Sequence, residues 1–139
     1  MMVNTEVIKR RLNQLTISLN KIERFEELSL EEFLKNDIVQ DVVEYNLFIA
    51  INMMVDIATH IVVDNNLGSP ETLGEAFNIL NNEKYLNDEE TKTFKKMVGL
   101  RNILSHEYLK IDKEIIYNIL HNNLVDIKKF ILFVNDNFA

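Results

Sequence analysis

Glycine and proline are rare in this chain: three glycines and one proline occur among 139 residues. These two residue types interrupt regular secondary structure most strongly, so their scarcity favours long helices. Apolar side chains recur at three- and four-residue intervals through most of the chain, and the alternation typical of strands and hairpins is missing from the sequence. The sequence therefore predicts an all-α fold.

The expected helices follow from this spacing and from residues that cap helix starts. They span about residues 4–25, 29–36, 37–66, 72–80, 87–108 and 112–134, and the second and fourth are short. The expected capping residues are Ser29 with Glu32 as a capping box, Asp37, Thr72, Asn87 or Asp88, and Asp112. Four long helices with short connections predict an antiparallel four-helix bundle with one or two short extra helices, in a single domain over 1–139.

Charge and composition exclude several classes of protein. The net charge is −7, which argues against general attraction to nucleic acid. Between Lys92 and Lys113, however, six positive residues face two negative ones, so this stretch carries +4 and the rest −11. Cysteine is absent, which excludes disulfides, thiolate metal sites and cysteine nucleophiles. We find no signal peptide or membrane span in the sequence and expect a cytoplasmic protein with no membrane partner.

Arg101 is the polar residue that fits its surroundings least, because it falls in the apolar stripe of the helix expected over 87–108. Such an arginine binds an anion, extends its head to solvent, or lines an interface, and an ion pair is the simplest alternative. His106 lies about 140° further around the same helix. The two side chains would converge poorly within one helix, which favours a composite site across a dimer axis.

An arginine and a histidine suffice for one reaction without metal or cofactor. Histidine can take the 2′-hydroxyl proton of RNA or protonate the leaving 5′-oxygen, and arginine can bind the phosphoryl oxygens. On the long third helix Asn52, Asp56 and His60 form a stripe at four-residue spacing. Two interpretations of this stripe stay open: a polar contact between helices, or a lining of the cleft or dimer interface that orients the Arg-His pair. A metal site at Asp56 and His60 is less favoured.

The octapeptide from Arg101 to Tyr108 resembles the signature of the HEPN superfamily, in which arginine, a polar residue and a later histidine mark the site. Its HepT-like branch has the tighter pattern of arginine, four residues, histidine, one residue and tyrosine. Here Arg101, Asn102, His106 and Tyr108 match it. The surrounding run 97–108, the helix start at Ile111-Asp112 and the segment 56–61 are also similar to the family, so the resemblance covers nearly the whole chain.

This resemblance implies a dimeric helical bundle that acts as the toxin of a toxin–antitoxin pair. Arg101 and His106 would be the catalytic pair of a metal-independent RNA endonuclease, with Asn102 supporting them. Tyr108 would be the residue that the antitoxin, a minimal nucleotidyltransferase often called MntA, modifies with AMP. That modification would bring negative charge beside Arg101, because the two residues share a helical face. The alternatives are a non-catalytic module that binds a nucleotide or the partner enzyme, and a plain dimeric adaptor.

Overall fold

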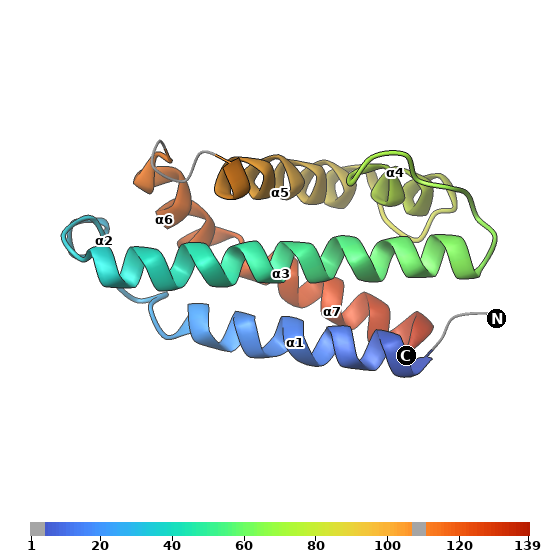
Figure 1. The fold of residues 1–139 in the computed structure, drawn as a ribbon, viewed down its shortest axis with the longest axis horizontal. Helices are drawn as coiled ribbons and strands as arrows, with labels where there is room; N and C mark the ends of the chain where they lie inside the picture. Colours follow the sequence, from blue (N-terminus) through green and yellow to red (C-terminus); the bar gives the residue numbers. More distant parts are fainter. Residues whose placement is uncertain (1–4, 107–110) are drawn as a thin grey trace.

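The structure is a computed structural model that describes residues 5–106 and 111–139. Within these ranges the chain forms only helices: α1 (Thr5–Glu23), α2 (Leu30–Leu34), α3 (Asp37–Asp64), α4 (Glu75–Asn82), α5 (Asp88–His106), α6 (Lys113–Asn122) and α7 (Leu124–Phe138). The all-α prediction is confirmed. Figure 1 shows α3 through the middle of the bundle, with α1 on one side and α4 and α5 on the other.

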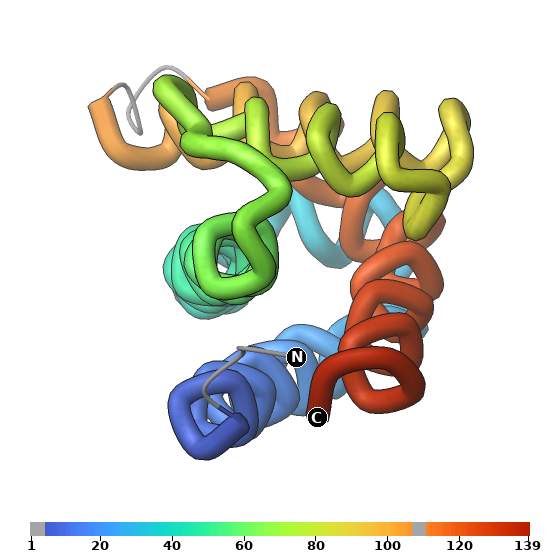
Figure 2. The backbone as a smooth tube through the Cα atoms, turned by 90° about the vertical axis from the view of Figure 1, so that its right-hand side faces the viewer, coloured from blue at the N-terminus to red at the C-terminus, as the bar shows by residue number. Residues whose placement is uncertain are grey.

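The central helix α3 packs against five of the other helices, namely α1, α2, α4, α5 and α6. The remaining helix, α7, packs against α1 and α6 and closes the bundle, as the end-on view shows (Figure 2). By length and composition alone α3 could cross a membrane, yet 56% of its most apolar window is buried inside the bundle. It packs as the core helix of the bundle, and its apolar surface is explained by having neighbours on several sides.

Three of the expected helix starts are confirmed at the level of individual hydrogen bonds. Ser29 and Glu32 form the reciprocal capping box, in which each side chain accepts a hydrogen bond from the other's backbone N–H. The backbone N–H of Ser29, followed by its hydroxyl, lowers the pKa of the Glu32 carboxyl. Asn87 and Glu90 repeat this exchange at the start of α5, and the Asp112 carboxylate accepts from the backbone of α6. These caps fix where α2, α5 and α6 begin.

Two other expected caps were wrong. The start of α3 is capped by Asn36, one residue before the predicted Asp37, and its amide oxygen accepts from the backbone of Val39. Asparagine and aspartate are about equally good caps, so spacing alone could not choose between neighbours. Thr72 was expected to cap the short fourth helix, but α4 starts three residues later, after Gly74, without a side-chain cap.

The C-terminal segment, predicted as one helix over 112–134, consists of two helices. It breaks at Asn123, whose backbone leaves the helical conformation while its side-chain amide donates to Asp126 in the first turn of α7. Apolar residues continue at four-residue spacing through the break, from Leu120 to Leu124, so the periodicity gave no sign of it. Asparagine has low helix propensity and bonds readily to nearby backbone, which favours the break here.

Candidate functional site

Arg101 extends from α5 toward α3, and two residues of α3 fix its guanidinium group. Its Nε donates to the amide oxygen of Asn52 at 2.7 Å. The guanidinium carbon lies 5.3 Å from the centre of the Phe48 ring, within the range of a cation–π contact. Phe48 and Asn52 are four residues apart and so lie one turn apart on the same face of α3. The sequence of α3 thereby sets both the position and the plane of the guanidinium.

The charge of Arg101 is not compensated within the described part of the chain. Nη1 donates to the amide oxygen of Asn102 at 3.1 Å, while no described carboxylate forms an ion pair with Arg101 and no described residue accepts from Nη2. The ion-pair alternative therefore does not hold among these residues. A planar cation with both bonds directed to neutral amides keeps donors available for an oxyanion such as a phosphate.

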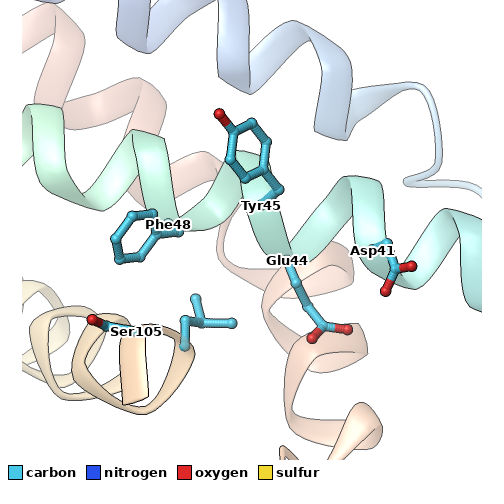
Figure 3. A pocket seen from close by; sticks show the side chains of 6 residues that line it. Asp41, Glu44, Tyr45, Phe48 and Ser105 are labelled. Atoms are coloured by element: carbon cyan, nitrogen blue, oxygen red, sulfur yellow. The ribbon is translucent and has the colours of Figure 1, made fainter. Parts of the chain in front are cut away.

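A hollow of about 340 Å³ lies beside this arginine, between α3 and the last turn of α5. Its lining consists of Asp41, Glu44, Tyr45, Phe48, Leu104 and Ser105 (Figure 3). Phe48 belongs both to this lining and to the contact with Arg101, so the hollow and the guanidinium are adjacent. Glu44 accepts from Lys113 of α6 at 2.7 Å, which offsets one of the two carboxylates. Figure 3 shows the Tyr45 ring directed away from α5, and 65% of this residue is exposed.

His106, the second half of the predicted pair, is the last described residue of α5 and is exposed. Within the described residues no hydrogen bond or ion pair joins it to Arg101, which is half-buried against α3. Whether the two side chains meet across a dimer axis stays a prediction. Asn102 accepts a hydrogen bond from Arg101, and its supporting role stays a prediction. Tyr108 lies outside the described residues.

The stripe on α3 divides between two neighbours. Asn52 accepts a hydrogen bond from Arg101, which fits the interpretation that the stripe orients the arginine. Asp56 instead forms a short ion pair with Arg11 of α1. His60 lies 3.9 Å from Asp56 and 4.0 Å from Asp64, as measured between nitrogen and oxygen. Asp56 therefore acts as the polar contact between helices that was the other interpretation.

The less favoured metal site finds no third ligand in the described residues. No group of three or more histidine or carboxylate side chains gathers there in an arrangement that could hold a metal ion. Phe48 and the hollow were missed at the sequence level. The signal that could have found Phe48 was its position four residues before Asn52, because the same stripe continues upstream.

Comparison with known proteins places the chain in a family. The profile described as ribonuclease HepT-like matches residues 15–134. The chain belongs to the HepT-like ribonuclease family. The mRNA nuclease HepT of Shewanella oneidensis is 32% identical over 100 residues, which cover 72% of this chain and 75% of that protein. The tRNA nuclease HepT of Aphanizomenon flos-aquae is 34% identical over 113 residues, covering 80% and 77%.

The fold is also that of a solved HEPN toxin. The tri-AMPylated HEPN toxin of Shewanella oneidensis, in complex with its MNT antitoxin, superposes on this chain with a TM-score of 0.87. The two chains are 26% identical, and the match covers 94% of this chain and 98% of the toxin. The predicted family, fold class and ribonuclease class are thus confirmed for the HepT-like chain.

Proposed function

We propose that this HepT-like chain is a cytoplasmic toxin that cleaves RNA as a homodimer, with Arg101 of one protomer and His106 of the other in each site. The observation that carries the proposal is the arginine held by neutral partners. Asn52, Phe48 and Asn102 fix the guanidinium without neutralising it, as a phosphate-binding group requires. The separation of Arg101 from His106 in the protomer supports the dimeric form of the site.

The proposed reaction needs only groups of the protein and the RNA. His106 removes the proton of a 2′-hydroxyl, whose oxygen attacks the adjacent phosphorus and displaces the 5′-oxygen. The products are a 2′,3′-cyclic phosphate and a 5′-hydroxyl, and a protonated histidine or water supplies the proton for the leaving oxygen. Arg101 binds the phosphoryl oxygens as their charge grows in the transition state. Asn102 holds the arginine in place.

Control by an antitoxin follows from the same charge argument. The antitoxin is an MNT nucleotidyltransferase, as in the solved toxin complex. It would transfer AMP from ATP to the Tyr108 hydroxyl and release pyrophosphate. The sequence places Tyr108 seven residues after Arg101, so the adenylate phosphate would compete for the guanidinium that RNA needs. Tyr108→Phe should remain toxic in cells that contain the antitoxin, whereas the unmodified sequence should not.

Mixing two inactive variants tests the composite site. Arg101→Ala and His106→Ala are purified separately, mixed, and allowed to exchange subunits. In a mixed dimer one site carries both changes and the other carries neither, so activity on RNA should return to about one quarter of the unmodified level. Each variant alone serves as the control. No recovery in a sample whose subunit exchange is verified by mass would place both residues in one protomer's site.

A second candidate is a non-catalytic module that binds a nucleotide. The acidic rim of the hollow favours it, since Asp41 can accept hydrogen bonds from ribose hydroxyls while the Phe48 ring packs on a base and Arg101 binds a phosphate. For such a module His106→Ala would change nucleotide binding, measured by calorimetry, without relieving growth arrest. For the ribonuclease the same variant would abolish both growth arrest and RNA fragmentation.

A further inference from the structure

The outward face of α5 carries a continuous exposed strip that ends at His106. Its members are Lys92, Lys95, Gly99, Asn102 and His106, at the three- and four-residue spacing that aligns side chains along a helix. All five are exposed, and Arg101 points the other way, toward α3. At 1.5 Å per residue the strip is about 21 Å long, which is enough for several nucleotides.

Uncompensated positive charge gathers at the start of this strip. Lys92, Lys95 and the neighbouring Lys96 are exposed, and none forms an ion pair with a described residue. By contrast Lys35, Lys113 and Lys128 each form an ion pair with a glutamate, at nitrogen–oxygen distances of 2.8, 2.7 and 3.2 Å respectively. In a chain with net charge −7, three exposed ammonium groups close together on one helix, without ion pairs to the described residues, form a surface suited to phosphate.

The three lysines also surround a hollow of about 410 Å³ between α4 and α5, which Asn78 and Asp88 border as well. Asp88 accepts a hydrogen bond from the Asn81 amide at 3.0 Å, and Glu90 is used as a helix cap. These carboxylates lie in the first turn of α5, at the end of the strip farthest from His106. The charge therefore changes from negative to positive along the strip, so that an anionic chain would be repelled at the helix start and retained over the lysines.

Gly99 occupies the middle of the strip and leaves the helix backbone uncovered there. A Cβ placed on Gly99 would have no heavy atom within 4 Å, so packing within the protomer does not require a glycine. Glycine inside a helix costs about 0.5–1 kcal/mol relative to alanine, which is a disadvantage unless something approaches the backbone closely. The absence of a side chain would let a ribose-phosphate backbone lie directly against α5 between the lysines and His106.

We propose that this strip is a track for single-stranded RNA, which binds phosphates at Lys92, Lys95 and Lys96, crosses Gly99 and delivers the strand to His106. The proposal deepens the proposed ribonuclease function and rests on it. A single strand fits better than a duplex because the strip is one row of residues wide, and proteins that bind single strands use a positive surface that follows one backbone.

Binding of an uncleavable RNA tests the track independently of cleavage. The ligand is a labelled 2′-O-methyl oligonucleotide of about 20 residues, which lacks the attacking hydroxyl, and the readout is fluorescence anisotropy at several salt concentrations. Lys92→Glu/Lys95→Glu should weaken binding at least about tenfold and reduce the slope of log affinity against log salt by about 1.4, for two lost phosphate contacts. Lys92→Ala/Lys95→Ala should give the same slope change with a smaller loss, and thermal melts should show both variants folded.

The matched control makes the same charge change on the other side of the bundle. Lys9 and Lys21 are exposed on α1, which lies across α3 from α5 (Figure 1). Lys9→Glu/Lys21→Glu should keep affinity within about twofold, because a long-range effect of net charge is screened at physiological salt. Equal weakening by both double variants, or an unchanged salt slope in the α5 variants, would overturn the track.

Cleavage separates the track from the proposed activity. The α5 variant should cut a long RNA at least about tenfold more slowly at low substrate concentration, whereas Lys9→Glu/Lys21→Glu should cut it at close to the unmodified rate. If neither the unmodified protein nor the α5 variant cuts any RNA, while the variant still binds the uncleavable RNA more weakly, the ribonuclease proposal fails and the track stands. If both cut long RNA equally and bind it equally, the ribonuclease stands and the track is wrong.

Discussion

Polar side chains on the two sides of α5 differ in burial and in bonding. On the inner side Arg101 is half-buried, bonded to Asn52 and Asn102 and packed over Phe48, so its position is fixed by α3. On the outer side Lys92, Lys95 and His106 project into solvent without ion pairs to the described residues. The same short motif thus holds Arg101 in place against α3 and leaves His106 accessible to solvent.

This difference is consistent with the proposal that a single protomer is an incomplete enzyme. A phosphate-binding group benefits from being fixed, because preorganised donors do not have to rearrange as charge develops. A general base must reach the substrate, so exposure is tolerable for His106 until a partner surface or the RNA encloses it. The inner side of α5 fixes the position of Arg101, and the outer side leaves His106 within reach of a substrate.

The largest test of this contrast compares Arg101→Ala with His106→Ala. Each should lower RNA cleavage about 100-fold or more, because each removes a group that acts in the transition state of the proposed reaction. Only Arg101→Ala should also reduce stability, by about 1–3 kcal/mol, since it leaves the Asn52 oxygen without its donor. Denaturant unfolding should place His106→Ala within about 0.5 kcal/mol of the unmodified chain. Equal destabilisation by both changes would contradict the division between the two sides.

The next effect in size concerns the charge of Arg101 rather than its position. Asn52→Asp should strengthen the bond to the guanidinium but neutralise it, so cleavage should fall about tenfold while the melting temperature is kept or raised. Asp56→Asn is the matched control on the next turn of α3. It breaks a half-exposed ion pair with Arg11, so cleavage should not change and stability should fall by no more than about 1 kcal/mol.

Asn102 joins the two sides, because it is exposed on the strip and accepts from Arg101. Asn102→Ala should reduce cleavage about fivefold, roughly the effect of one lost hydrogen bond of about 1 kcal/mol, with little change in unfolding. The loss should appear in kcat rather than in KM, because the arginine is misplaced and not removed. A pure increase in KM would instead make Asn102 a contact for RNA.

The smallest expected effect is a gain on the outer side. Gly99→Ala should stabilise the chain by about 0.5–1 kcal/mol, because the added methyl group meets no neighbour and alanine favours the helix. For a chain of this size the melting temperature should rise by about 2–4 °C. An unchanged or lower melting temperature would show that the backbone at Gly99 is constrained in some other way.

The sequence predicted most of the helices and the direction of the central side chains. Helical spacing and the Ser29 and Asp112 caps gave the element order, and the angle between Arg101 and His106 gave their separation. The break at Asn123 could not be predicted, because apolar spacing runs through it and tertiary packing decides the outcome. For the Phe48 contact the sequence offered only the four-residue spacing from Asn52, since the turn of α3 that meets Arg101 depends on how two helices pack.

The break at Asn123 has a consequence for the order of folding. It lets one C-terminal segment contact two distant sets of neighbours, since α6 packs against α2 and α3 while α7 packs against α1. Helices α1, α3 and α5 can therefore pack, and Arg101 can bind Asn52, before α7 docks. Until α7 docks, the side of α1 that it covers remains exposed to water. We expect a folding intermediate of this kind to hold the arginine in place while the bundle is still open.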